Sequence, residues 1–419
     1  MAPSLCLPPP PRRPPPGAFA HHAAGVARLN HGSFGAAPAG VLQAQRAAAE
    51  RWRAQPDALY FSGELDGELQ RACDAAARAF GCTPSRSALV ENATLAAAAV
   101  ASRWASRLGP GDVTLCASST YGGVKSVLRH YCERLGGGRL VEVQLGGFEA
   151  HFDSAAVVAA YAAAAQKHRA RFAVVDHVVS QPSALLPVRE VAAACRAAGV
   201  EEVMVDGAHS AGNVPGLRVE EQLLGCGGEV DCRVDYWFSN LHKWAFASNS
   251  VCLMSWAPGK EDGLHHPVPS WNYGGGFAAE ARWAGTRDWS AFLSVPSALE
   301  FWQSMGGDGL ALANAQASLV AARWLSETWG TPMPPQTALQ TALQMVRLPG
   351  GNAWTPESVG RLRTRMREEH NVEASVVRLG AGQGPAHLRL SMQLVYIDED
   401  DVRRLATAVE QEMDAALKG

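Results

Sequence analysis

The sequence predicts an α/β protein with a mostly parallel sheet covered by helices on both faces. One observation is the alternation of short apolar runs with helical segments between residues 68 and 256, a pattern typical of strands that are buried on both faces. A second observation is size. The 419 residues, 47% of them hydrophobic, exceed one average domain, so we expect a second domain.

The elements of the larger domain follow in chain order from apolar runs bounded by Gly, Pro and Asp. Gly81-Cys82-Thr83-Pro84 ends the first helix, and Gly109-Pro110-Gly111-Asp112 is a strong turn before a strand. The predicted helices are Glu68–Phe80, one that begins near Thr94, Tyr121–Leu135 and Val188–Ala198. The predicted strands are Ser87–Val90, Val113–Cys116, Phe172–Val175, Val203–Val205, Tyr236–Ser239 and Val251–Trp256.

The C-terminal part has a different order of elements and predicts a smaller α+β domain. We expect the large domain to span 21–305 and the small one 306–419, with the N-terminal segment, about 21–70, a candidate to pack on the small domain. Residues 1–20 are rich in proline, which predicts a disordered tail. The predicted elements are the helices Leu310–Trp329, Pro356–Glu369 and Glu399–Leu417 and the strands Leu343–Leu348, Glu373–Leu379 and His387–Val395.

Composition excludes several classes of function. A net charge of −3 gives no electrostatic footprint for nucleic acid or an anionic membrane, and no apolar run is long enough to span a bilayer. Nine cysteines without a C-x-x-C pair argue against a disulfide scaffold or a metal site and favour a reducing, cytoplasmic location. The alternative is an organelle, because Arg12 and Arg13 precede the first acidic residue, Glu50, as in a transit peptide.

Lys243 and Asp206 carry the main functional prediction. Lys243 follows an apolar run within Asn240-Leu241-His242-Lys243-Trp244, and Asp206 follows another. A pyridoxal phosphate (PLP) enzyme needs a lysine for the Schiff base and a carboxylate that keeps the pyridine nitrogen protonated. His209, three residues after Asp206, would pack on the ring or bond its phenolic oxygen. The alternatives are a surface lysine, a turn aspartate and a structural histidine.

Further candidates surround this pair because ligands of such sheets lie outside the carboxyl ends of the strands. Ala93 and Thr94 start a helix whose N–H groups suit a phosphate, although Thr94 is equally suited to be an N-cap. Tyr121 would stack on the ring, unless it is an ordinary half-buried tyrosine. Arg389, on an alternating strand, would hold the substrate carboxylate, unless it faces solvent. The remaining candidate cofactor-binding residues are Ser180, Ser239, Asn240 and His242.

Together these residues resemble the class V aminotransferase family of fold-type I PLP enzymes. The resemblance is to the isopenicillin N epimerase-like branch, which includes plant-type L-cysteine desulfhydrases and hercynylcysteine sulfoxide lyases. It covers nearly the whole chain from residue 28. The matching stretches are Leu29–Gly35, Asn92–Thr94, Pro110–Asp112, Tyr121-Gly122, Asp206–His209, Asn240–Trp244, Gly285–Asp288 and Leu388–Ser391.

The resemblance implies a homodimer with two active sites at its interface. It implies that Gly285 and Thr286 reach the phosphate in the partner's site, and that Asn30 and His31 approach the substrate mouth, where a plain turn is the alternative. Two departures separate the chain from cysteine desulfurases. It has no cysteine after Cys252 to form a persulfide, and Ser180 and Leu186 replace an Asn and a Gln. The segment 245–249 also lacks the usual Pro and Gly.

We therefore expect a PLP-dependent carbon–sulfur β-lyase that acts on a small amino acid. Its substrate would be L-cysteine or a cysteine (sulfoxide) conjugate, and its products a sulfur compound, pyruvate and ammonia. An epimerase or aminotransferase is the alternative, since both reactions begin with removal of the same α-proton by Lys243. A PLP-fold homologue without catalysis is a second alternative, which the intact set of Asp206, His209 and Lys243 disfavours.

Overall fold

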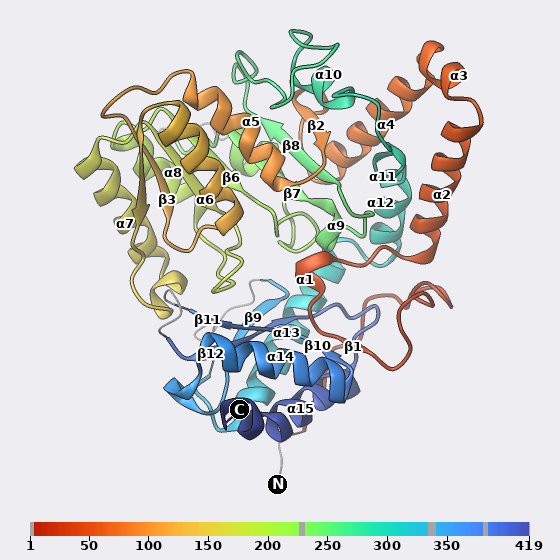
Figure 1. Ribbon diagram of the computed structural model, residues 1–419, viewed down its shortest axis with the longest axis vertical. Helices are drawn as coiled ribbons and strands as arrows, with labels where there is room; N and C mark the ends of the chain where they lie inside the picture. Colours follow the sequence, from red (N-terminus) through yellow and green to blue (C-terminus); the bar gives the residue numbers. More distant parts are fainter. Residues whose placement is uncertain (1–3, 226–230, 334–340, 380–383, 419) are drawn as a thin grey trace.

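A computed structural model describes residues 4–225, 231–333, 341–379 and 384–418, and it contains two layered parts (Figure 1). The larger part is built on a seven-stranded sheet, and the C-terminal part is built on a three-stranded sheet below it in that view. No helix within these ranges is both long and apolar enough to cross a membrane.

The seven-stranded sheet confirms the predicted fold class. All its strands run parallel except β8, which is antiparallel to both of its neighbours. The carboxyl ends of the parallel strands therefore meet at one edge, where Asp176 of β5 stands opposite Asp206 of β6. In spatial order the strands are β2 (Ser87–Val90), β8 (Cys252–Trp256), β7 (Tyr236–Asn240), β6 (Glu202–Asp206), β5 (Phe172–Asp176), β3 (Val113–Ala117) and β4 (Arg139–Val143).

Helices cover both faces of this sheet because its strands are apolar on both sides. One face packs on α5 (Ala93–Ala105), α6 (Gly122–Leu128), the π-helical turn Arg129–Leu135 and α10 (Phe277–Arg282). The other face packs on α2 (Ala39–Ala54), α3 (Pro56–Phe61), α4 (Glu64–Ala79), α7 (Ser154–His168), α8 (Val188–Ala197), α11 (Ser290–Leu293) and α12 (Val295–Ser304). Short helical turns lie at Pro84–Arg86, Glu149–Phe152, Glu220–Leu224 and Gly351–Ala353.

The C-terminal part has its own hydrophobic core. Its antiparallel sheet has the order β11 (Ser375–Arg378), β12 (Ala386–Ser391) and β9 (Leu343–Arg347), and it packs with α13 (Asp308–Trp329), α14 (Pro356–His370) and α15 (Glu399–Lys418). We propose a domain boundary between residues 305 and 306. In support, α12 ends at Ser304, and six buried residues of α13 between Ala313 and Trp329 belong to the C-terminal core, whereas only Leu310 of this helix belongs to the core of the larger part.

The N-terminal segments divide between the two parts. The strand β1 (Ala27–Arg28) pairs with β10 (Val372–Glu373) of the C-terminal part, as expected for the beginning of the segment 21–70. The helices α2 and α4 instead pack on α11 and α12 of the larger part. The expectation fails there because the apolar residues of these helices, such as Val41 and Leu69, belong to the larger core.

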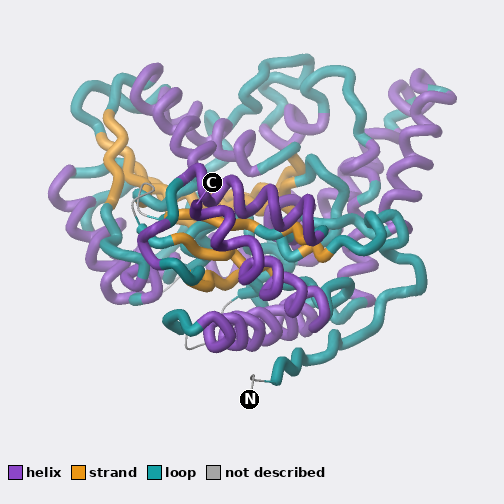
Figure 2. Tube along the Cα trace, turned by 60° about the horizontal axis from the view of Figure 1, so that its bottom comes forward, coloured by secondary structure: helices purple, strands orange, loops and turns teal. Residues whose placement is uncertain are grey.

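A disordered tail is wrong for residues 4–20. Leu5 is buried in the C-terminal core, the amide of Leu7 donates a hydrogen bond to Glu399 (2.9 Å), and Arg403 donates one to the carbonyl of Leu5. Figure 2 shows this segment as an extended loop along the outside of the molecule. Its leucines supply apolar area that can be buried, which the proline content of the tail did not reveal.

Candidate active site

A cavity of about 400 Å³ lies at the carboxyl ends of the parallel strands. The predicted convergence of distant segments is correct, because Ser180, Asp206, His209 and Lys243 all line this cavity. Other lining residues are Gly32, Ser33, Phe34, Asn92, Ala93, Thr94, Tyr121, Val124, Asp176, Val178, Gln181, Ala208, Asn240, His242, Ser375 and Arg389.

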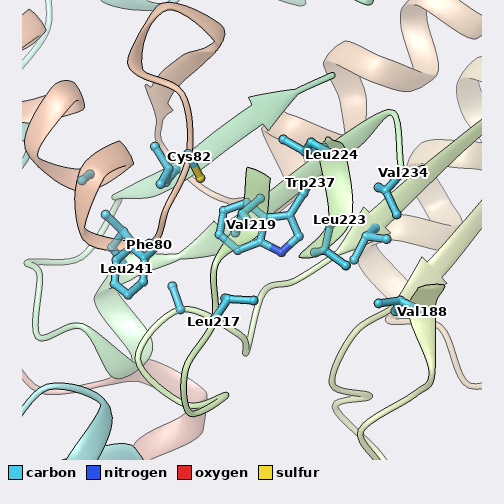
Figure 3. Close-up of a cluster of buried hydrophobic side chains, with 14 of the residues drawn as sticks. Phe80, Cys82, Val188, Leu217, Val219, Leu223, Leu224, Val234, Trp237 and Leu241 are labelled. Atoms are coloured by element: carbon cyan, nitrogen blue, oxygen red, sulfur yellow. The ribbon is translucent and has the colours of Figure 1, made fainter. Parts of the chain in front are cut away.

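The strand β7 fixes the start of the lysine segment from both faces of the sheet. Its side chains alternate, so that Trp237 lies in one hydrophobic core and Phe238 in the other. Figure 3 shows Trp237 and Leu241 among the packed apolar side chains of the first core. The four-residue helix α9 (Leu241–Trp244) begins where the strand ends and carries Lys243 into the cavity.

A glycine allows the N-terminal helix α1 (His31–Phe34) to approach this lysine helix. Gly35 has φ of 69°, and a Cβ atom there would lie 1.7 Å from the carbonyl oxygen of His242. No larger residue fits at that position without moving α9. This contact explains why the stretch Leu29–Gly35 matters to the site although it is far from Lys243 in sequence.

Lys243, His209 and Trp244 form a chain of contacts. The Nζ of Lys243 lies 3.1 Å from Nε2 of His209, and Nε1 of Trp244 donates a hydrogen bond to Nδ1 of the same ring (3.3 Å). Burial, and then the Lys243 charge, hold the pKa of His209 well below its usual value, so the ring is neutral. Since Nδ1 accepts, the proton of the neutral ring resides on Nε2.

The amine of Lys243 is unusually easy to deprotonate. Burial lowers the pKa of Lys243 from 10.5 to about 8, against the opposing effect of the Asp206 carboxylate. Among the described residues, no carboxylate forms an ion pair with this amine. A half-buried lysine with a lowered pKa in a cavity is suited to attack a carbonyl or move a proton.

Two carboxylates face each other at the floor of the cavity. Asp206 accepts a hydrogen bond from the amide of Ala208 (2.9 Å), and burial raises its pKa. Burial and the neighbouring Asp206 raise the pKa of Asp176 to about 7, and Thr120 donates a hydrogen bond to it (2.6 Å). Asp176 was not among the residues predicted from the sequence, although it ends a buried strand just as Asp206 does. A cation bound beside the pair would favour the ionised form of both.

Arg389 is a buried guanidinium that only neutral groups hold. It donates hydrogen bonds to Oγ of Ser180 (3.0 Å), to Oδ1 of Asn30 (3.2 Å) and to Oγ of Ser33, while its Nε has no partner. Within the described ranges it forms no ion pair. Burial lowers the pKa of Arg389 to about 10. A carboxylate entering the cavity would supply the missing negative charge.

The start of α5 also lines the cavity. The side chain of Asn92 caps the helix by accepting from the amide of Leu95, and Asn240 accepts from the amide of Ala93 (3.0 Å). Thr94 lines the cavity. His242 binds the carbonyl of Val251 through Nδ1 (3.1 Å), which leaves Nε2 for another partner.

Several predicted residues lie outside the cavity lining. Ser239 is fully buried and accepts a hydrogen bond from the amide of Ala211 (2.9 Å), which is a structural contact. His31 contacts the hydroxyl of Tyr396 (2.5 Å) instead of the cavity. Asn30 does not line the cavity, but its side chain accepts a hydrogen bond from Arg389, which does. Gly285 and the exposed Thr286 do not line it in this single chain, whereas Tyr121 lines it and is 56% exposed.

The loop after the lysine adopts an unusual backbone without glycine. Phe246 has φ of 58°, a region that costs a non-glycine residue about 1–2 kcal/mol. Its ring is fully buried and packs against Phe19, His31 and Phe301, which offsets that cost. This explains how the segment 245–249 keeps its shape without the usual Pro and Gly.

The residues fit PLP. Lys243 is a half-buried amine without an ionic partner among the described residues, the Asp206 carboxylate lies in the same cavity, and Thr94 at the start of α5 offers a hydroxyl for a phosphate. Arg389 stands ready for the carboxylate of an amino acid. These four features are what an enzyme of this class requires.

Comparison with known proteins gives the family. The chain is 33% identical over 419 residues to an L-cysteine desulfhydrase of Arabidopsis thaliana, covering 94% of this chain and 89% of the relative. It is 28% identical to an isopenicillin N epimerase of Amycolatopsis lactamdurans, covering 92% and 95%. The cystine C-S lyase C-DES, solved with its product cysteine persulfide, has the same fold (TM-score 0.72, 18% identity, 92% and 97% covered). No protein-family profile matches the chain.

The fold and the site define a PLP-dependent enzyme of the class V aminotransferase type, as the sequence predicted. Within that class, the chain belongs to the L-cysteine desulfhydrase family of PLP-dependent lyases.

Proposed function

We propose that this chain is a carbon–sulfur β-lyase that converts L-cysteine or a cysteine (sulfoxide) conjugate and water into a sulfur compound, pyruvate and ammonia. For L-cysteine the sulfur product is hydrogen sulfide. The single observation that carries the proposal is that a half-buried lysine amine and a buried guanidinium without an acidic partner line one cavity, and no described cysteine lines that cavity.

The cavity lining supports release of the sulfur, because none of its described residues is a cysteine. A desulfurase needs a thiolate of its own to take the sulfur as a persulfide. The seven cysteines with free thiols include none after Cys252, and Cys252 itself is fully buried in the sheet with its pKa held well above 9 by burial. We therefore expect the sulfur to be released into solvent as sulfide, or together with its substituent, instead of passing to a cysteine of the enzyme.

The chain's own residues supply positioning and proton transfer. Bound PLP supplies a ring that withdraws electrons from the substrate α-carbon. Arg389 grips the α-carboxylate, with Ser180, Asn30 and Ser33 holding the guanidinium in place. Lys243, whose pKa of about 8 leaves a substantial fraction of the amine neutral at that pH, takes the α-proton on Nζ.

The remaining residues hold the cofactor. Asp206 would pair with the pyridine nitrogen, and Asp176 behind it adds negative charge that favours a protonated ring. His209, with its proton on Nε2, is a donor for the phenolic oxygen or packs on the ring. Ala93, Thr94, Asn240 and His242 would hold the phosphate. Tyr121 would stack on the ring.

The decisive experiment follows products and α-proton exchange together in PLP-loaded protein. With L-cysteine or a cysteine sulfoxide we expect stoichiometric pyruvate and ammonia, with the sulfur product released in the same amount. Exchange of the α-proton with deuterium from solvent, without pyruvate from either substrate, would reject the lyase and favour an epimerase or aminotransferase, as the epimerase relative suggests.

A second experiment tests whether the site is catalytic at all. Borohydride treatment of the loaded enzyme should attach the cofactor to Lys243, as detected by peptide mass. Lys243→Ala should lose this mark, and Lys260→Ala, a lysine of the larger part that is ion-paired with Glu202, should keep it. A reducible link that persists in Lys243→Ala would contradict the assignment.

We further propose a homodimer in which the partner's Gly285 and Thr286 complete the phosphate site. In support, Thr286 is exposed in the single chain. A Thr286→Tyr variant should bind PLP more weakly and sediment differently from the wild-type dimer if this surface is the interface. Unchanged mass and unchanged PLP affinity would count against it.

We propose a cytoplasmic location, with an organelle as the alternative. The buried Leu5 supports a segment that stays with the protein, since cleavage of a transit peptide after residue 5 would remove part of the core. Cys232 is disulfide-bonded, which counts against a reducing compartment. Fractionation of cells and sequencing of the mature N-terminus would decide between the two.

A further inference from the structure

A second cavity, of about 310 Å³, lies next to the proposed active site and is rich in arginine. We call it the arginine cavity and define it by Arg28, Arg363, Arg367, His31, Phe34 and Glu373. It lies beside the N-terminal helix α1 and between this helix and α14 of the C-terminal part.

The arginine cavity carries an excess of positive charge. Glu373 lies 3.8 Å from Arg28, which is a loose ion pair, and Arg367 bonds the exposed Glu368. Arg363 forms no hydrogen bond or ion pair with any described residue. His31 adds no charge, because burial and the neighbouring Arg28 lower its pKa to about 3. The cavity thus offers two guanidinium groups, on Arg363 and Arg367, to an anion.

The two cavities share a wall. The ring of Phe34 lines both and is 72% exposed, and the consecutive residues Ala374 and Ser375 line one cavity each. Ser375 stands opposite Arg389 in the sheet register. The positive charge of Arg363 contributes to the lowered pKa of Arg389, which places the two guanidinium groups within electrostatic range. A molecule held by Arg389 therefore has the arginine cavity beside it.

We propose that the arginine cavity binds a second anionic group of the substrate, so that the preferred substrate is a cysteine S-conjugate whose sulfur substituent ends in a carboxylate or sulfonate. This inference rests on the proposed function. Free L-cysteine has only one carboxylate, which Arg389 would take, and it leaves the arginine cavity unused. A dianionic conjugate would neutralise both sets of guanidinium groups.

The test separates binding from catalysis by using a probe that cannot react. The probe 3,3′-thiodipropionate has two carboxylates around a thioether and no amine, and its monoamide is the matched neutral compound. Calorimetric titration of the PLP-loaded enzyme should show that the diacid binds about 5- to 30-fold more tightly than the monoamide, a range set by charge-assisted pairs that are partly screened by solvent. High salt should shrink the difference.

Variants on one helix provide the control. The double substitution Arg363→Gln and Arg367→Gln should abolish the preference for the diacid. Arg361→Gln should keep it, because Arg361 is bonded to the carbonyl of Ala416 on α15 and does not line the cavity. Equal binding of the two probes by the wild type, or an equal loss in all variants, would overturn the proposal.

Turnover then tests the substrate class. The wild type should have a higher kcat/KM for S-(2-carboxyethyl)-L-cysteine than for its amide, with the difference mainly in KM, and the double variant should lose this difference while its kcat/KM for L-cysteine stays the same. If the binding preference holds but no substrate releases pyruvate, the proposed lyase function is wrong and the anion site stands. If L-cysteine is cleaved but neither preference appears, the lyase function stands and the proposed anion site is wrong.

Discussion

Replacing the guanidinium of Arg389 should greatly weaken the binding of the substrate. In Arg389→Met the guanidinium is lost, and in Arg389→Lys the charge remains without the two parallel N–H donors that match a carboxylate. The structure sets the scale. The guanidinium is 4% exposed and has no acidic partner in the described residues, so a substrate carboxylate would form a buried charge pair with it.

Breaking such a buried pair costs about 2–4 kcal/mol, which corresponds to a fall in kcat/KM of roughly 30- to 1000-fold for Arg389→Met. The kcat/KM of Arg389→Lys should lie between that of Arg389→Met and that of the wild type. The fall should come mainly from KM, because the proton transfer by Lys243 does not involve this side chain. The assay is pyruvate release from L-cysteine, with cofactor absorbance as the check that PLP is still bound.

A substrate without the carboxylate charge makes the test specific. With L-cysteine methyl ester, wild type and Arg389→Met should show similar kcat/KM, since the charge pair is absent from both. Arg347→Met, on the neighbouring strand β9 and outside the cavity, is the matched control and should keep wild-type kinetics. An unchanged KM for L-cysteine in Arg389→Met would refute the proposed role of Arg389. An equal loss of kcat/KM with L-cysteine and with its methyl ester would refute it as well.

Three further predictions concern the lysine segment. Because burial holds the pKa of Lys243 at about 8, the rate at which PLP attaches to cofactor-free protein should rise up to about pH 8 and level off above it; a rise that continues toward 10.5 would contradict this. Trp244→Phe removes the donor to Nδ1 of His209, so the ring ¹⁵N shifts should move from one neutral tautomer to a mixture; unchanged shifts would exclude the hydrogen bond. Gly35→Ala should lower the Tm of unfolding, because its Cβ meets a carbonyl at 1.7 Å and its φ is positive, whereas Gly40→Ala, in open space on α2, should not.

Local pattern was sufficient for elements with strong periodicity and clear turn residues. The predicted strands at residues 87–90, 113–116, 172–175, 203–205 and 236–239 agree with the structure to within a residue at their ends. The alanine-rich helix α7 and the edge strand β4 were missed, because alanine carries no apolar periodicity and an edge strand is only half-buried. The predicted strand His387–Val395 ends at Ser391, where the chain turns to reach α15.

The sequence by itself determined the fold class and the family, and it predicted Lys243 and Asp206 as the residues that hold the cofactor, because these inferences depend on residue types at fixed distances from the ends of strands. It could not determine which candidates share a cavity. Ser239 lies on the same strand as Asn240, yet the alternation of side chains turns its hydroxyl toward the amide of Ala211. His31 is likewise turned toward Tyr396.

Only the tertiary structure decided how the charged side chains are protonated and paired. Lys243 has a lowered pKa because the packing of two cores and α1 removes water from around it. Arg389 has no acidic partner among the described residues, because the two distant segments that hold it, 30–33 and the loop at Ser180, offer it only neutral oxygens. Asp176 became part of the site because the sheet register sets it beside Asp206. The arginine cavity likewise exists only where α1, β10 and α14 meet. The sequence specifies the residue types, whereas the removal of water from the charged side chains and the short distances between them arise only when the chain folds.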